Sequence, residues 1–274
     1  MIFLIACEQD IILDIPEAEK KIVVNAVISP GDSLKINLSK SLYILDSDND
    51  KPTFLANATA NLYENSSFIQ TLFYLNNGNY VSSHQVKEGN IYRLEVSVPD
   101  FNMVSAETRI PNKIKILKLD TATVSGSNEY DKNLQFKLRF NDPPAEENYY
   151  MITVYQSFNN SGTYDFSRIG SSSQDEAIGL IRTFDQRLIF TDELINGKNT
   201  EIVFKTQNFF HGDIVKVELS HITRDYFLYL KSLDLQYKTK NNPFAENVKV
   251  YNNIENGFGI LGAFNPYSDT LTIQ

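Results

Sequence analysis

In Leu134-Gln135-Phe136-Lys137-Leu138-Arg139-Phe140, every second side chain is large and apolar, and the side chains between them are polar. Successive side chains of a β-strand point to opposite faces, so this alternation predicts a strand with one buried face and one face in water. Strands of antiparallel sheets commonly show this pattern, whereas strands of parallel sheets are covered on both faces and read as continuous apolar runs. The stretch therefore indicates an antiparallel sheet.

The same alternation recurs at Leu34–Leu38, Tyr92–Val98 and Val215–Leu219. Turn signals separate these runs, among them Pro30-Gly31-Asp32, Asn76-Asn77-Gly78-Asn79, Glu88-Gly89-Asn90 and His211-Gly212-Asp213. Asn196-Gly197 is the strongest hairpin signal, because both central residues of a type I′ turn need a positive φ. Short strands with regular turns predict an all-β fold of two antiparallel β-sandwich domains.

One helix is expected within the second domain, near residues 223–238. Thr223 can cap its N-terminus, while Asp225 in the first turn and Lys238 near the end suit the helix dipole. Its apolar stripe consists of Tyr226, Phe227, Leu230 and Leu233. The run Asn241-Asn242-Pro243 is expected to end it. We interpret the stripe as core packing.

The charge balance excludes one class of partner. The chain of 274 residues has a net charge of -9 and a pI near 4.9, and it has no stripe of Lys and Arg, so nucleic acid is not expected to bind. The single cysteine, Cys7, allows no internal disulfide, so packing alone must stabilise the fold.

The N-terminal residues Leu4-Ile5-Ala6-Cys7 fit a bacterial lipobox, in which a small residue precedes the cysteine that receives the lipid. The preceding run is too short and lacks a positive charge, so we interpret residues 1–7 as a truncated lipoprotein signal. Acyl chains on Cys7 would anchor the protein, since each buried methylene contributes ~0.8 kcal/mol. The alternative is a buried N-terminal strand with a chance cysteine.

The rest of the chain divides into three segments. Residues 8–21 show no sustained periodic spacing of apolar residues, and they carry Pro16 with a charged run. They are expected to form a tether. Residues 22–110 form the predicted N-terminal sandwich, and residues 111–274 form the C-terminal sandwich with the helix. The boundary lies at Ile110-Pro111-Asn112, where one strand pattern closes and a new apolar run opens.

No motif predicts a catalytic, cofactor or metal site. His84, His211 and His221 lack ligand-spaced partners and are expected to be structural or exposed. The acidic loop Asp46–Asp50 is similar to the start of a calcium loop, but Lys51 stands where the tight turn needs glycine. A solvated loop is favoured there, and a weak calcium site stays open.

Two residue sets leave alternatives open. Asp185, Asp192 and Glu193 could meet as the paired carboxylates of a glycoside hydrolase, although nothing in the sequence marks a pocket. Four tyrosines could stack on a sugar ring, although most are expected to be half-buried strand residues. They are Tyr149, Tyr150, Tyr155 and Tyr164.

Several stretches, besides the lipobox with Glu8 and Asp10, match one known family in order and spacing. They are Lys21–Ala26, Gly89–Val96, Ser105–Pro111, Phe140–Pro143, Asn148–Tyr150, Asp225–Phe227 and Asn252–Ile260. Together they resemble a family of Bacteroidota lipoproteins, the domain of unknown function 4249. The resemblance implies a two-domain β protein on the outer membrane, often encoded beside TonB-dependent receptors, with no established activity. The strand at Gly89–Val96 is also similar to prealbumin-type modules, so an Ig-like or prealbumin-like sandwich is expected.

These observations support three hypotheses. The first is a lipid-anchored accessory protein of the outer membrane that faces the cell exterior, is not an enzyme, and partners a TonB-dependent receptor in nutrient uptake. The second is a stand-alone surface protein that binds a glycan or peptide. The third, ranked last, is a hydrolase. All three place the protein at a membrane through the lipid on Cys7.

Overall fold

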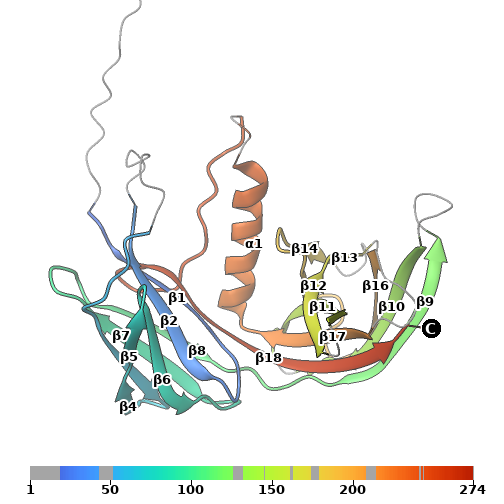
Figure 1. Cartoon of the computed structure of the whole chain (residues 1–274), viewed down its shortest axis with the longest axis horizontal. Helices are drawn as coiled ribbons and strands as arrows, with labels where there is room; N and C mark the ends of the chain where they lie inside the picture. Colours follow the sequence, from blue (N-terminus) through green and yellow to red (C-terminus); the bar gives the residue numbers. More distant parts are fainter. Residues whose placement is uncertain are drawn as a thin grey trace, which may run out of the picture.

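The computed structural model of the chain describes residues 19–42, 52–125, 132–144, 146–160, 163–173, 179–207, 214–240, 242 and 244–273. Cys7, His211 and the acidic loop Asp46–Asp50 lie outside the described residues, as does most of the predicted tether. Within the described ranges the strands form one ten-stranded sheet and two four-stranded sheets, accompanied by one helix (Figure 1). The predicted all-β, sandwich-like fold is confirmed.

The first sandwich uses one end of the ten-stranded sheet. The strands at this end are β1 (Ile22–Ile28), β2 (Ser33–Lys40), β6 (Asn79–Gln85) and β5 (Phe73–Asn76), and they face a sheet of β4 (Ser67–Thr71), β3 (Thr59–Glu64), β7 (Ile91–Ser97) and β8 (Val104–Arg109). The alternation predicted at Tyr92–Val98 is realised, since Tyr92, Leu94 and Val96 are all buried. These side chains pack in a core with their counterparts on β1 and β2.

The second sandwich uses the other end of the same sheet. The strands here are β17 (Ile214–Ile222), β11 (Tyr149–Asn160), β12 (Thr163–Ile169), β15 (Leu188–Thr191) and β14 (Ile181–Arg182), and they face β9 (Ile116–Ser125), β10 (Lys132–Asn141), β16 (Asn199–Gln207) and β13 (Ser171–Ser172). Phe136 of β10 stacks on Phe204 of β16 with ring centroids 5.0 Å apart. The alternating stretch at residues 134–140 thus supplies one wall of the second core.

A single strand, β18 (Phe258–Thr272), joins the two sandwiches. Its first residues, Phe258–Ala263, pair in parallel with β1, and its later residues, Phe264–Thr272, pair antiparallel with β17. Figure 1 shows β18 running as one ribbon from the first sandwich into the second. The ten-stranded sheet is therefore continuous because one strand belongs to both halves.

Two glycines permit the close contact between β18 and β1. A Cβ atom on Gly259, whose φ is +112°, would lie 1.9 Å from the Val24 carbonyl oxygen. A Cβ atom on Gly257 would lie 2.7 Å from the Ile22 carbonyl oxygen. The stretch Asn252–Ile260 on which the family resemblance partly rests therefore has a structural role at this junction.

Helix α1 (Arg224–Thr239) covers the face of the large sheet opposite the second core. Thr223 caps it as predicted, because its hydroxyl accepts a hydrogen bond from the Tyr226 backbone N–H. Tyr226, Phe227 and Leu230 are buried against the sheet. The helix starts at the sheet and rises away from it, so its C-terminal end projects from the molecule (Figure 1).

The hairpin predicted at Asn196-Gly197 is wrong. β15 before this turn and β16 after it belong to different sheets, and only Gly197 of the two residues has a positive φ. The Gly197 backbone N–H donates to the Asp142 carboxylate over 2.7 Å, so a tertiary contact holds the turn. A type I′ hairpin instead occurs at Asn65-Ser66, which joins β3 to β4 with positive φ at both residues.

The predicted division at residue 110 coincides with a change of core. Ile110 packs in the first core and Ile114 in the second. The first core also contains Ile254, Leu261 and Ala263, which come from the end of the chain. Whether residues 22–110 form an independent domain stays a prediction.

Candidate binding site between the two sandwiches

A groove of about 550 Å³ lies where the first and second sandwiches meet, and we call it the central groove. Six segments line it: the start of β7, the end of β8, the connection at residues 110–114, the loop before β11, the end of β17 and the start of α1. Its charged and aromatic side chains are Glu107, Arg109, Glu146, Glu147, Tyr149, His221, Arg224 and Asp225.

A buried amide shapes the loop before β11. The Asn148 side-chain amide donates to the carbonyl oxygens of Pro143 and Glu146 and to the Asp192 carboxylate, at 2.9, 2.9 and 3.1 Å. Asn148 is buried, so these bonds satisfy it without water. The loop is thereby held in a conformation that places Glu146 and Glu147 along the groove.

Tyr150 fixes the floor beneath this loop. Its hydroxyl donates to Asp142 over 2.5 Å, and its ring stacks on Phe190 and on His221. Burial, followed by the bond to Asp142, raises the pKa of Tyr150 far above its ordinary value. The tyrosine is a neutral structural donor and does not face a ligand.

His221 forms part of the groove wall. Its Nδ1 lies 2.9 Å from the Asn112 carbonyl oxygen, so Nδ1 carries the proton and Nε2 is left as an acceptor. Burial lowers the pKa of His221 below its ordinary value, against the opposing effect of the bond to Asn112. The ring is therefore neutral at neutral pH.

Tyr149 presents the second aromatic ring of the groove. Its hydroxyl donates to Glu147 over 2.8 Å, and its ring packs on Phe227 of α1 with centroids 5.2 Å apart. Burial raises the pKa of Tyr149, and the hydrogen bond to Glu147 raises it further. With Arg109 and Arg224 on the same walls, the groove offers cationic, anionic and aromatic contacts to one ligand.

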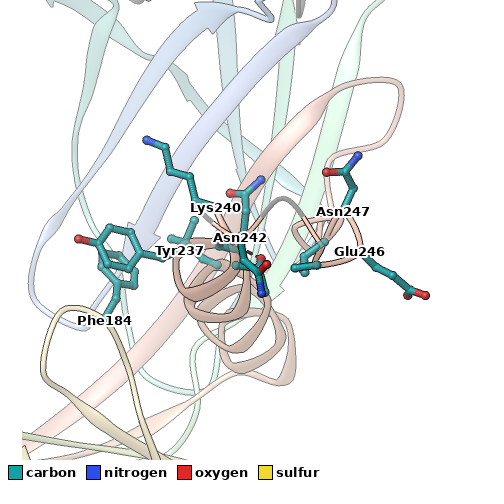
Figure 2. A pocket seen from close by; sticks show the side chains of 11 residues that line it. Phe184, Tyr237, Lys240, Asn242, Glu246 and Asn247 are labelled. Atoms are coloured by element: carbon teal, nitrogen blue, oxygen red, sulfur yellow. Dashed lines mark hydrogen bonds between the residues drawn. The ribbon is translucent and has the colours of Figure 1, made fainter.

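A second hollow of about 770 Å³ lies at the C-terminal end of α1. Phe184 and Tyr237 stack on one side of it with ring centroids 5.0 Å apart, Glu246 and Asn247 lie on the other side, and Asn242 lies between them (Figure 2). Both hollows are open to solvent. Charged side chains from both halves of the molecule line the central groove, whereas exposed aromatic rings line the hollow at the end of α1.

The predicted carboxylate set does not converge. Asp185 and Asp192 lie beyond opposite ends of β15, whose four residues alone span ~13 Å. Asp185 pairs with Arg187 and Arg168 at 2.5 and 3.1 Å, and Asp192 is buried beside Asn148. The paired carboxylates considered for a hydrolase are therefore not formed by these residues.

The other predicted residues have local roles. His84 lies 3.3 Å from Glu64 in the first sandwich, far along the chain from His221. The Lys216 ammonium lies 4.3 Å from the centroid of the Tyr155 ring and so covers one face of that ring. Over the part of the chain that the structure describes, no three His, Cys, Asp or Glu side chains are placed to hold a metal ion.

Sequence reasoning did not single out Arg109, Arg224 or the three glutamates of the central groove as site residues. Charged residues at element ends and in connections carry no periodic signal, so nothing local distinguishes them from ordinary surface residues. One signal was present, because five of the stretches that carry the family resemblance contribute lining residues to the groove. They are Gly89–Val96, Ser105–Pro111, Phe140–Pro143, Asn148–Tyr150 and Asp225–Phe227.

The family profile described as "Domain of unknown function (DUF4249)" matches residues 8–270. The chain belongs to this family. The match confirms the DUF4249 resemblance stated above, while the Bacteroidota origin stays a prediction. No curated protein matches this DUF4249 chain.

Solved structures offer only distant similarity to this DUF4249 protein. A β-glucuronidase of Parabacteroides merdae is 12% identical, with 73% of this chain and 23% of that chain covered and a TM-score of 0.23. Three N-terminal domains of the outer capsid protein Hoc of bacteriophage RB49 are 11% identical, with 93% and 70% covered and a TM-score of 0.25. The MSCRAMM protein ACE of Enterococcus faecalis is 7% identical, with 92% and 95% covered and a TM-score of 0.22. TM-scores this low carry no argument about function.

The one described helix, α1, is neither long nor apolar enough to cross a bilayer.

Proposed function

We propose that this DUF4249 protein is a lipid-anchored, non-catalytic binding protein of the outer membrane that holds a ligand in the central groove. In this proposal it faces the cell exterior and passes its ligand to a TonB-dependent receptor in nutrient uptake. The observation that carries the proposal is the groove itself, in which both signs of charge and two aromatic rings line one space between two rigid cores.

The chemistry of the groove favours a peptide as ligand. Arg109 and Arg224 suit a carboxylate, and Glu107, Glu146 and Glu147 suit an ammonium group or backbone N–H groups. The rings of Tyr149 and His221 add apolar faces. A volume of about 550 Å³ falls within the range of small-ligand sites, which matches a short peptide segment.

Peptide binding is tested by thermal-shift measurements on the full chain with tripeptides and, in parallel, with oligosaccharides. Peptides that carry both charges are expected to raise the melting temperature, because a ligand that binds only the folded state stabilises it. Arg224→Ala should weaken the effect by roughly tenfold in affinity, the cost of a lost charged hydrogen bond. Arg139→Ala is the matched control, because Arg139 is exposed on β10 and pairs with Glu201.

Two outcomes contradict the groove proposal. Stabilisation by oligosaccharides alone would favour the glycan-binding hypothesis. Equal responses of the Arg224→Ala and Arg139→Ala variants would place any ligand outside the central groove.

The anchor and the partner need a separate experiment in cells that carry the native gene with its upstream DNA. Labelled palmitate should be incorporated into the wild-type protein and not into the Cys7→Ala variant. Pull-down from detergent-solubilised membranes should recover an outer-membrane barrel with the wild-type protein. A secreted, unlabelled protein would contradict the proposed lipid anchor. Recovery of the bait alone would contradict the proposed receptor partner.

A further inference from the structure

Four large apolar side chains are exposed around the projecting end of α1, and we call them the helix-tip surface. Phe184 is 39% exposed, Leu235 51%, Tyr237 62% and Phe244 94%. Leu235 and Tyr237 lie in the last turns of the helix, Phe244 lies just beyond it, and Phe184 stacks on Tyr237 (Figure 2). Tyr237 and Phe184 line one hollow, and Leu235, two residues before Tyr237, lies on the opposite side of the helix. The exposed apolar side chains therefore surround the projecting end, which marks it as a contact surface.

The charge around the helix-tip surface differs in sign from that of the whole protein. Residues 231–249 carry four lysines and two carboxylates, whereas the chain has a net charge of -9. One of the two carboxylates, Asp234, is neutralised by Lys238 over 2.6 Å. The local excess of lysine beside aromatic rings is complementary to an anionic surface that also has an apolar layer.

The start of the chain lies on the same side of the molecule. Figure 1 shows the beginning of β1 on the side toward which α1 rises. Eleven residues, 8–18, separate Cys7 from Glu19, and fully extended they span at most about 40 Å. The sixteen residues of α1 rise ~24 Å, so an anchor on Cys7 can reach the level of the helix tip.

We propose that the helix-tip surface docks on the anionic lipid bilayer, as a second membrane contact beside the acyl chains. Phe244 and Tyr237 enter the headgroup region, and Lys240 and Lys249 face the lipid phosphates. The inference rests on the proposed anchoring through Cys7, since that anchor turns this side toward the membrane. A single acyl attachment leaves the orientation of a protein free, and a second contact fixes it.

The absence of tryptophan from the sequence supplies a direct test. The full chain with Cys7→Ala and Phe244→Trp carries one tryptophan, at the tip, and no acyl chain. Vesicles of phosphatidylethanolamine and phosphatidylglycerol, at roughly 3:1, should shift its emission to the blue, and brominated lipids should quench it. The matched control is Cys7→Ala with Phe68→Trp, because Phe68 is 56% exposed on the first sandwich; its emission should not change.

Sedimentation with the same vesicles tests the side chains themselves. In the Cys7→Ala background, Tyr237→Ser with Phe244→Ser should weaken binding by roughly tenfold or more, since two apolar groups no longer leave water. Phe68→Ser with Phe73→Ser should leave binding unchanged, and phosphatidylcholine vesicles should bind the tip less than the anionic ones.

Three outcomes would overturn the lipid contact: no blue shift at the tip, the same shift at the control position, or full binding by the Tyr237→Ser, Phe244→Ser protein. A tip that binds a membrane protein and no vesicle would also overturn it. The two proposals are tested by different measurements. Palmitate labelling in cells reports the Cys7 anchor, and vesicle binding by the unacylated Cys7→Ala chain reports the lipid contact of the tip.

Discussion

Gly259 stands where two backbones meet without room for a side chain. Its φ of +112° strains any L-residue, and a Cβ atom there would lie 1.9 Å from the Val24 carbonyl oxygen. Gly259→Ala should therefore lower the free energy of unfolding by about 3 kcal/mol, measured by urea denaturation. Gly31→Ala is the control, because Gly31 also has a positive φ but nothing within 4 Å of the added Cβ; it should cost about 1 kcal/mol. Equal costs would show that β18 can move away from β1.

Tyr92 links stability to alkaline pH. It is fully buried, and its hydroxyl donates to Glu64 and accepts from the Lys87 backbone N–H. Burial, followed by the bond to Glu64, raises the pKa of Tyr92 to about 12. The folded state then holds a proton that the unfolded state releases near pH 10, so stability is present below pH ~10 and falls as the pH rises toward ~12.

The measurement is the free energy of unfolding from urea titrations at several pH values above neutrality. The wild-type protein should lose stability across that alkaline window, and Tyr92→Phe should lose less of it because the titrating phenol is gone. Tyr251, whose pKa is also raised to about 12 by burial and then by Asp225, accounts for part of the remaining slope. An unchanged slope in Tyr92→Phe would show that Tyr92 ionises in the folded state as it does in the unfolded one.

At the scale of single elements, Thr223 connects the helix to the sheet. Its hydroxyl accepts from the Tyr226 backbone N–H at the helix start and from the Ala263 backbone N–H of β18, both over 3.3 Å. Thr223→Ala should cost about 1–2 kcal/mol of unfolding free energy, because both donors lose a partner. Thr239→Ala at the exposed C-terminal end should change stability by less than ~0.5 kcal/mol. Similar costs at the two ends would argue that the cap contributes nothing.

Strands and helices with one solvent-exposed face were predictable from the sequence. A strand buried on both faces was not. β7 and β10 alternate because water covers one side of each, and α1 shows its stripe and cap for the same local reason. In β18 the residues Ile260–Ala263 are all buried, because a core covers one face and α1 covers the other, so the period is lost. Its partner β1 lies more than 200 residues earlier in the sequence, and no local pattern reports that pairing.

The candidate site was harder to predict than the fold for a related reason. The central groove gathers its lining residues from six segments, each of which reads as an ordinary connection or element end. Asn196-Gly197 shows the same limit in a turn. A local bond from the Lys198 N–H to the Ile195 carbonyl closes the turn, but the strands on either side belong to different sheets, and the carboxylate of Asp142, from another part of the chain, also binds it. Sites built by tertiary contact need the sheet order before their residues can be grouped.

At the scale of the whole molecule, β18 makes the two sandwiches depend on each other. The strand pairs with one edge of β1, and its side chains Leu261 and Ala263 belong to the first core. Asn265 of the same strand donates to Glu88 of the first half and to the Pro111 carbonyl at the boundary, at 2.8 and 2.9 Å. The central groove sits on this junction, so its walls keep their spacing only while both sandwiches are folded.

Residues 22–110 expressed alone should therefore fail to fold cooperatively. The fragment lacks the strand that pairs with Val23–Ile28, and its core lacks Ile254, Leu261 and Ala263. Circular dichroism should show no sharp thermal transition, since a small domain that loses part of its core has little stability left.

Adding a synthetic peptide of residues 252–264 should restore the transition, because the peptide supplies both the strand and the missing side chains. The same peptide with Gly259→Ala should not restore it, since the added methyl group collides with the Val24 carbonyl. A fragment that melts sharply alone, with no response to either peptide, would make the first sandwich a self-contained domain. In that case β18 would only join two finished units, and the groove between them would be free to open.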